Sequence, residues 1–466
     1  MNIDAIEKVE ILPMNPPPNN AYSFRNGNPI VQFQIANAEK FLMGSSLRLN
    51  GTFRLNRGVS TETNIQLPDN NNNKGGGEFG ITINNKIGLH STIQQITLSN
   101  QQNQSLETIR NYNRYLASVV PNTHSADDLN TSLTLKSLGS SSHMGNALMV
   151  NNDAGFSLPL LTGMLNSANP IPLGNNGIRG LVIQLELAPD SSVIHNSNRA
   201  RATDATANNG AFYQLRDLSL TFDLLVPDES GKSKMAIPAT GAFQYNSVNN
   251  LYSVVNTNDL TQTLNLGTSN TLSVIHNFIP TTHINNYLQD GFKTTGLQNI
   301  VNADYGPDID IKEVHFTKGG VKFPLDYEVD CEDTEEQNLP SVNVERNFVN
   351  AIKPIGQYNH NVKSLWTSSN KNTKNDLNGN PKVSNTEFST YQNTLNAAAE
   401  VVVNNKNFGI GVNFDPVSRV GINFKNTPYG IRIKSNLDGN SPNSIYTYTL
   451  NKNTLQYSPG GIVVSN

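Results

Sequence analysis

Few residues in this sequence have the types and spacing that chemistry requires. The histidines are scattered, and no two stand four residues apart, the spacing that puts two metal ligands on one helical face. A metal site would therefore have to be assembled entirely by the fold. His276 is in phase with Val274 and Phe278, so we expect a partly buried strand residue there instead of a ligand. The eight histidines are His90, His124, His143, His195, His276, His283, His315 and His360.

Three short motifs resemble parts of functional loops, and each is incomplete. Gly231–Ser233 reads GKS, but Val226 stands where a phosphate-binding loop needs its first glycine. Gly409–Gly411 reads GIG without the third glycine of a dinucleotide fingerprint, and we expect a strand bulge there. Gly139–His143 reads GSSSH and lacks the closing glycine of a nucleophile elbow. These motifs predict neither a phosphate site nor a nucleophile.

The densest run of charge is the acidic segment Asp330–Glu336, which reads DCEDTEE. Its oxygens suit a hard cation such as calcium, but the glycine turn of a calcium loop is missing, and a solvated loop is favoured. Whether the segment holds a cation stays open. The only cysteine, Cys331, lies inside it, where the surrounding negative charge disfavours a reactive thiolate. Trp366 could stack on a sugar, but an anchor at the root of a long polar loop is the more ordinary role.

We therefore predict no catalytic, cofactor-binding or metal-ligating residue, no cofactor, and a protein that is not an enzyme. The composition is consistent with a structural or binding function. Charged residues make up only 15% of the 466 residues, and asparagine, at about 70 positions, fills much of the deficit. The net charge of −4 gives no basis for direct binding to nucleic acid, which needs clustered Lys and Arg. A single cysteine excludes a disulfide framework within the chain.

Alternation of apolar and polar residues dominates the elements that would position any site. Leu47–Leu55 is the clearest case, because Leu47, Leu49, Phe53 and Leu55 point one way and the polar residues between them point the other. The same rhythm appears around residues 31–35, 181–187, 218–224, 272–278, 412–414 and 431–433. Strands joined by short turns and long polar loops predict an all-β protein built of antiparallel sandwiches.

Two segments have helical spacing instead. Leu106 to Val119 and Phe388 to Val402 each carry apolar residues three and four apart, which predicts one amphipathic helix in each half of the chain. Val226–Gly241 interrupts the strand pattern with Pro, Gly and charge. We therefore expect an N-terminal arm at 1–20, a first sandwich at 21–226, a linker at 227–240 and a second sandwich at 241–466.

Five segments of the sequence resemble segments of a known protein family. Phe156–Asp190 contains FSLPLLTGMLNSANPIPLGNNGIRGLVIQLELAPD, Tyr213–Pro227 reads YQLRDLSLTFDLLVP, and Asp310–Asp330 reads DIKEVHFTKGGVKFPLDYEVD. Thr447–Asn466 reads TYTLNKNTLQYSPGGIVVSN, and Ile87–Ser118 looks like a strand followed by a helix. Together they resemble the double jelly-roll major capsid proteins of double-stranded DNA viruses, most closely those of the virophage and polinton-like virus group.

The resemblance implies a fold and a role. The family has two eight-stranded jelly rolls side by side, and its homotrimers have a pseudo-hexagonal outline and tile an icosahedral shell. The implied partners are copies of the chain, neighbouring capsomers, and minor capsid or penton proteins, and the implied location is the virion. This chain is shorter than many members, which implies smaller loop insertions.

The two ends of the chain carry further expectations. Residues 1–20 contain one lysine, Lys8, and no arginine, which favours a shell around separately condensed DNA or an internal membrane over direct RNA packaging. They lack the basic start and apolar run of a signal peptide, and no later stretch approaches a membrane span. The apolar Ile6–Leu12 and the stiff Pro16–Pro18 fit either an arm that ties to a neighbour or a disordered end. Ile445–Val464 is expected to be strand.

Other functions stay open at this point. A minor capsid, penton or fibre protein would share many of these features. A carbohydrate-binding β-sandwich would be expected to cluster exposed aromatic residues on its loops, and a sandwich-fold glycan hydrolase would need paired carboxylates that sequence spacing cannot locate.

Overall fold

The structure is a computed structural model of the whole chain. It describes residues 3–56, 81–83, 87–123, 153–167, 169–196, 212–227, 240–255, 259–286, 291–292, 311–324, 328–330, 347–348, 350–355, 409–414, 417–435, 443–458 and 460–465. Strands dominate these residues, and every pairing between them is antiparallel. The all-β fold class predicted from alternation is confirmed.

The first half of the chain forms two facing sheets. Sheet 1a has the order β1-β12-β4-β8, with β2 beside β12 and β9 beside β4, and sheet 1b has the order β3-β10-β6-β7. The strands are β1 Ile3–Ile11, β2 Ala21–Tyr22, β3 Ile30–Ile35, β4 Phe41–Asn56, β6 Ile93–Ser99, β7 Ser105–Arg110, β8 Asp153–Pro159, β9 Ile171–Pro172, β10 Leu181–Leu187 and β12 Phe212–Pro227. A separate pair joins β5 Ile81–Ile83 to β11 Ile194–Asn196.

The second half repeats this arrangement. Sheet 2a has the order β13-β21-β15-β19, with β22 beside β21, and sheet 2b has the order β14-β20-β16-β17, with β18 beside β16. The strands are β13 Gly241–Val255, β14 Asp259–Leu264, β15 Thr271–Pro280, β16 Ile311–Lys318, β17 Val321–Lys322, β18 Glu328–Asp330, β19 Ile410–Asn413, β20 Tyr429–Ser435, β21 Asn443–Ser458 and β22 Gly461–Ser465.

The two halves share one topology. When the eight main strands of each half are counted in chain order, one sheet runs first-eighth-third-sixth and the other runs second-seventh-fourth-fifth. This is the strand order of a jelly roll, in which two Greek keys fold into a two-sheet sandwich. The chain is therefore a tandem of two jelly rolls, as the resemblance predicted. Within the described residues no strand pairing joins residues before 227 to residues after 241.

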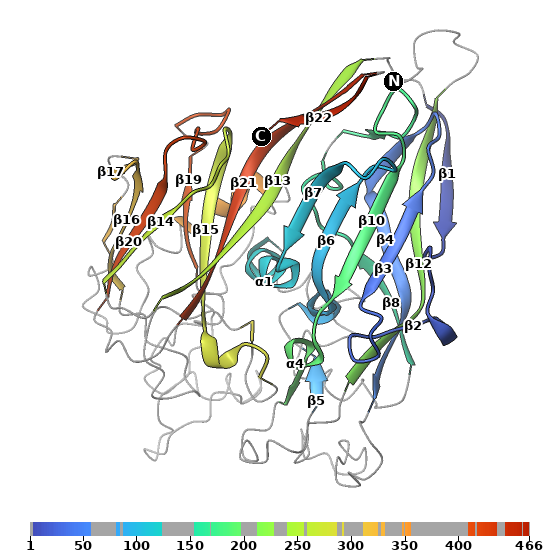
Figure 1. Cartoon of the computed structure of the whole chain (residues 1–466), viewed down its shortest axis with the longest axis horizontal. Coiled ribbons are helices and arrows are strands. Elements are labelled where there is room, and N and C mark those ends of the chain that lie inside the picture. The colour runs from blue at the N-terminus through green and yellow to red at the C-terminus, as the bar shows by residue number, and fades with distance from the viewer. Residues whose placement is uncertain are drawn as a thin grey trace, which may run out of the picture.

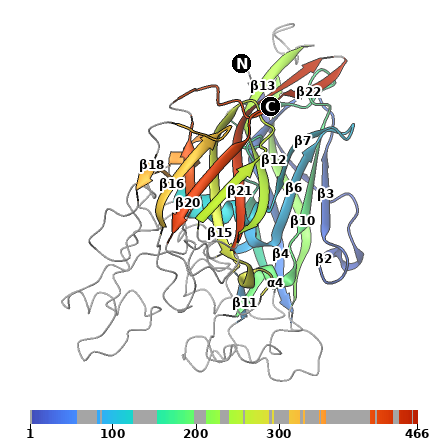
Figure 2. The same ribbon diagram turned by 60° about the vertical axis from the view of Figure 1, so that its left-hand side comes forward.

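The four sheets lie side by side as layers (Figure 1). Sheet 1a and sheet 2b are the outermost layers, and sheets 1b and 2a face each other in the middle, with α1 (Tyr112–Thr123) between the rolls. Figure 2 shows β13 and β22 extending together at the top of the view, toward the first roll. The remaining described helices are short: α4 Asp190–Val193, η1 Pro18–Asn20, η2 Gly88–Thr92, η4 Thr281–His283 and η5 Lys353–Ile355.

The hydrophobic pattern explains which face of each strand is buried. In β4, Leu47, Leu49, Phe53 and Leu55 are buried, as the alternation predicted, and the polar residues between them lie on the outer face of sheet 1a. All ten residues of β15 are buried, because this strand is covered on both faces. β21 is buried along its first nine residues for the same reason. The core of the chain is continuous across both rolls.

Two predictions about local structure were wrong, each for a tertiary reason. The helix expected at 106–119 begins only at Tyr112, because residues 105–110 form β7 and pair with β6. Residues Ile3–Ile11, expected to belong to a separate arm at 1–20, form β1, the first strand of the first jelly roll, because β12 pairs with them along their length.

Other expectations had different outcomes. The strand expected at 445–464 is confirmed as β21 and β22. The helix expected at 388–402 lies outside the described residues, as does most of the linker expected at 227–240. In the described part of the chain, no helix is long and apolar enough to cross a membrane.

Candidate functional surfaces

Side chains that could do chemistry are scattered in the structure as they are in the sequence. Among the described residues, no three His, Cys, Asp or Glu side chains lie close enough together to hold a metal ion. His90, His276 and His283 are buried, and His315 is partly exposed on sheet 2b. His124, His143 and His360 lie outside the described residues.

His276 is a core residue, as its place in the alternation predicted. Its Nδ1 lies 2.9 Å from Thr447 Oγ1 and its Nε2 lies 2.8 Å from the Tyr429 hydroxyl, so both ring nitrogens are satisfied. The ring stacks on Phe316 and Tyr429. Burial disfavours the charged form and lowers the pKa of His276 to about 3. The residue therefore stays neutral and joins the two sheets of the second roll.

Of the incomplete motifs, only Gly409–Gly411 lies within the described residues. Gly409–Gly411 runs into β19, where Gly411 pairs with Ile275, but the expected bulge is wrong, because the pairing of β19 with β15 has no register shift. Gly139–His143, Gly231–Ser233 and Trp366 lie outside the described residues. Of the acidic segment, Asp330 ends β18, and Cys331 and the acids after it lie outside the described residues.

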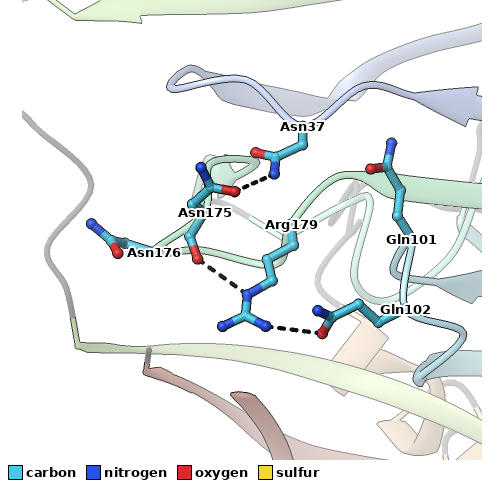
Figure 3. A pocket seen from close by; sticks show the side chains of 6 residues that line it. All are labelled: Asn37, Gln101, Gln102, Asn175, Asn176 and Arg179. Atoms are coloured by element: carbon cyan, nitrogen blue, oxygen red, sulfur yellow. Dashed lines mark hydrogen bonds between the residues drawn. The ribbon is translucent and has the colours of Figure 1, made fainter. Parts of the chain in front are cut away.

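A polar hollow of about 510 Å³ lies at one end of the first roll, between the β3–β4, β6–β7 and β9–β10 connections. Figure 3 shows its amide side chains around Arg179. Arg179 Nε donates to Asn175 O at 3.2 Å and its Nη1 donates to Gln102 Oε1 at 3.1 Å. Asn37 Nδ2 donates to Asn175 Oδ1 at 2.5 Å. No carboxylate, imidazole or aromatic ring lines the hollow, so it offers hydrogen bonds but neither acid–base groups nor a stacking platform.

The most elaborate polar site is the seam where the two rolls meet. Glu107 on β7 points into it and is almost fully buried. Its carboxylate accepts N–H groups from Gly163 at 3.2 Å and Met164 at 2.9 Å, both in the first roll, and from Val248 on β13 of the second roll at 3.4 Å. One side chain thus joins both rolls.

Burial dominates the electrostatics of Glu107. It raises the pKa of the carboxyl to about 7, although the backbone N–H groups favour the ionised form and oppose the shift. The neighbouring hydroxyls of Tyr112 and Tyr245 are buried too, and burial raises the pKa of both well above the usual value. Tyr245 Oη donates to Leu106 O at 2.6 Å, a second bond across the seam.

Helix α1 closes the seam further along. Arg114 lies over the rings of Phe292 and Tyr446, with the guanidinium carbon 5.3 Å and 4.9 Å from the ring centres, and it donates to Gly291 O. Tyr448 Oη donates to Asn111 O at 3.0 Å. Because these contacts join residues of both halves, the relative position of the rolls is tightly specified.

The outer layers, by contrast, present polar faces. On sheet 1a, Arg48 and Arg54 alternate with the buried core residues of β4, and Asn50 Nδ2 donates to Thr221 Oγ1 at 3.0 Å. On sheet 2b, Glu313 pairs with Lys434 and lies 3.3 Å from His315 Nδ1. These ion pairs are partly exposed, and pairs of this kind contribute little to stability.

Sequence reasoning missed the seam. Glu107 and Arg114 were not distinguishable from surface charges, because nothing in their local spacing signals burial. The one available signal was the position of both residues within a strand-then-helix segment that is otherwise strongly apolar.

Comparison with known proteins supports the fold. No family model matches the chain, and no curated protein sequence matches it. Among solved structures, the cryo-EM structure of the Sputnik virophage is similar at a TM-score of 0.57 and 11% identity, covering 100% of this chain and 89% of that one. The PBCV-1 virus capsid gives 0.55 and 12%, covering 100% and 98%. The mavirus major capsid protein gives 0.51 and 10%, covering 98% and 90%. The chain therefore has the double jelly-roll fold found in these capsids.

Proposed function

We propose that this chain is a major capsid protein of a double-stranded DNA virus. Its homotrimers are the pseudo-hexameric capsomers that tile an icosahedral shell, so its location is the virion. The observation that carries the proposal is the pair of jelly rolls with identical strand order set side by side in one chain. Capsid proteins of this architecture match the chain over almost its entire length.

Three copies of a two-roll chain supply six similar sandwiches, which is what a six-sided tile needs. A three-fold ring uses a heterologous contact, in which one surface of each copy meets a different surface of the next, and growth stops when the ring closes. The polar outer faces of sheets 1a and 2b fit smaller, more polar contacts between capsomers. Such contacts release misplaced units before a shell closes.

The remaining assignments follow from the proposed role. The two domains are 21–226 and 241–466, joined by 227–240, with β1 added to the first domain. The partners are copies of the chain, neighbouring capsomers and minor capsid or penton proteins. The weak net charge argues against direct nucleic acid binding and leaves room for an internal membrane beneath the shell. The proposed function is assembly with other capsid subunits through surface contacts, without catalysis.

Native mass spectrometry of the purified chain tests the proposal first. Three copies of 50.9 kDa make about 153 kDa, and negative-stain electron microscopy should show particles of hexagonal outline. A monomer at all concentrations, or a fibre without closed particles, contradicts the proposal.

The same measurement separates the alternatives. A penton protein should give five copies, and a fibre protein an elongated particle. A carbohydrate-binding sandwich should be retained on a glycan array. The amide hollow of Figure 3 lacks the aromatic ring on which sugars commonly stack, which weighs against that reading.

A further inference from the structure

We infer that the free edge of β1 is covered, in the assembled protein, by β17 and the 414–424 segment, described at Phe414 and at 417–424, of a second copy of the chain. The inference rests on the proposed function and names the surfaces that join the copies. The two rolls of one chain already meet through a contact of this kind.

The contact inside the chain provides the template. β13 is an edge strand of sheet 2a, and its open edge is covered by the first roll. The covering elements are β7, through Glu107 and its bond to Val248 N, and the 160–167 segment. Gly163 in that segment packs so closely on β13 that a Cβ there would overlap the main-chain oxygen of Asn246.

Each of these elements has a counterpart of the same rank in the other roll. β13 is the first strand of its roll, and β1 is the first strand of the other. β7 is a fifth strand, and β17 is its counterpart. The 160–167 segment follows the sixth strand, β8, and the 414–424 segment follows the sixth strand, β19. A contact between β1 and the β17 flank therefore repeats the one within the chain.

These counterparts carry exposed apolar side chains in the single chain. β1 pairs only with β12, and no described strand pairs with its other edge. Ile6 on β1 is 59% exposed. Val321 on β17 is 65% exposed and Val417 is 54% exposed. Ile6 lies among exposed charged residues such as Glu7 and Lys8, and the open edge of β1 is a surface that soluble proteins normally cover or protect.

The two valines belong to one flank of the second roll. Phe323, two residues after Val321, packs on Phe414, three residues before Val417, with ring centres 5.8 Å apart. Val420, in the same segment, is exposed as well. The Phe323–Phe414 contact thus ties β17 to the 414–424 segment, and the Lys318 ammonium lies over Phe323 and Phe424 on the same flank.

One chain cannot make this contact with itself. β1 and β17 lie at opposite ends of the row of layers (Figure 1). The β17 flank of one copy must therefore meet β1 of another, which is a heterologous contact of the kind that closes into a ring. The same contact that orders two rolls in a chain would order the copies around the capsomer.

A mixing experiment with two exposed-site variants tests the inference. Ile6→Asp should disable the β1 surface, and Val417→Asp should disable the flank of the second roll. Because each change places a charge in an apolar contact that becomes buried between copies, we expect each variant to weaken self-association at least about tenfold and to run as a monomer in native mass spectrometry. Each variant keeps one intact surface. An equimolar mixture should therefore form a heterodimer of about 102 kDa, two copies of 50.9 kDa, and no larger ring.

Val463→Asp is the matched control, since Val463 on β22 is 61% exposed and lies outside both surfaces. It should assemble like the wild-type chain. Circular dichroism verifies folding, and Ile6→Lys with Val417→Lys repeats the test with the opposite charge. Trimers in either Asp variant, a mixture without heterodimer, or loss of assembly in the control would overturn the inference while the proposed function stands. Failure of the wild-type chain to associate at any concentration would contradict both the inference and the proposed function.

Discussion

Replacing Gly163 with alanine should loosen the seam between the two jelly rolls. A Cβ at this position would overlap Asn246 O and lie 2.6 Å from its carbonyl carbon, closer than the 3.0 Å that real Cβ atoms keep. Neither partner can turn aside, because both are main-chain atoms. β13 and the 160–167 segment must therefore move apart.

The magnitude follows from what that movement costs. Forced overpacking costs about 1–3 kcal/mol. Separation also stretches the bond from Val248 N to Glu107, and an unsatisfied buried donor costs about 1–3 kcal/mol. Since part of the strain relaxes, we expect a loss of about 2–4 kcal/mol, or a fall of roughly 4–16 °C in the unfolding midpoint of a unit of about 200 residues.

Differential scanning calorimetry provides the assay, with Gly155→Ala as control. Gly155 lies in β8, and a Cβ there meets nothing within 4 Å, so this variant should stay within about 0.5 kcal/mol of the wild type. If Gly163→Ala melts with the wild type, the close approach at the seam is not rigid and the reasoning is refuted.

Three further changes probe the buried polar groups. The pKa of His276 is about 3 in the folded protein and 6.5 in an ordinary histidine. The free energy of unfolding should therefore fall by about 1.4 kcal/mol for each pH unit between 6.5 and 3. In urea titrations, His276→Leu should lack this part of the pH dependence. Glu107 has the opposite sign, since its pKa rises from 4.5 to about 7, and stability should fall as pH rises between those values; a Glu107→Gln variant with an unchanged slope contradicts the assignment. Arg114→Lys keeps the charge but loses the planar contacts with Phe292 and Tyr446, so chemical denaturation should show a loss of about 1–2 kcal/mol in the free energy of unfolding. An unchanged free energy of unfolding would contradict a stabilising role for these two contacts.

The strands were predictable because their signal is local. In β4 and β10, every second side chain faces the core, so burial follows directly from a period of two. The same local logic placed His276 in the core between Val274 and Phe278, and burial with satisfied ring nitrogens is what the structure shows.

The helix that begins late shows where local signals stop. Leu106 and Ile109 are three residues apart, which suits a helix, yet both lie in β7, where Ile109 pairs with Ile96 of β6. An antiparallel partner supplied by the fold outweighs a weak intrinsic preference. β1 is a similar case. Its residues were expected to form an arm, and they form a strand because they pair with β12, more than 200 positions later in the chain.

The sequence by itself determined the all-β class, the two-part organisation and the absence of a recognisable catalytic motif, because alternation, turn residues and motif spacing are properties of neighbouring positions. Only the tertiary structure decided which strand edges are covered and which are open. It also decided that Glu107 and Arg114 are buried at a seam. Those facts depend on segments far apart in the chain that meet only when both sandwiches have closed.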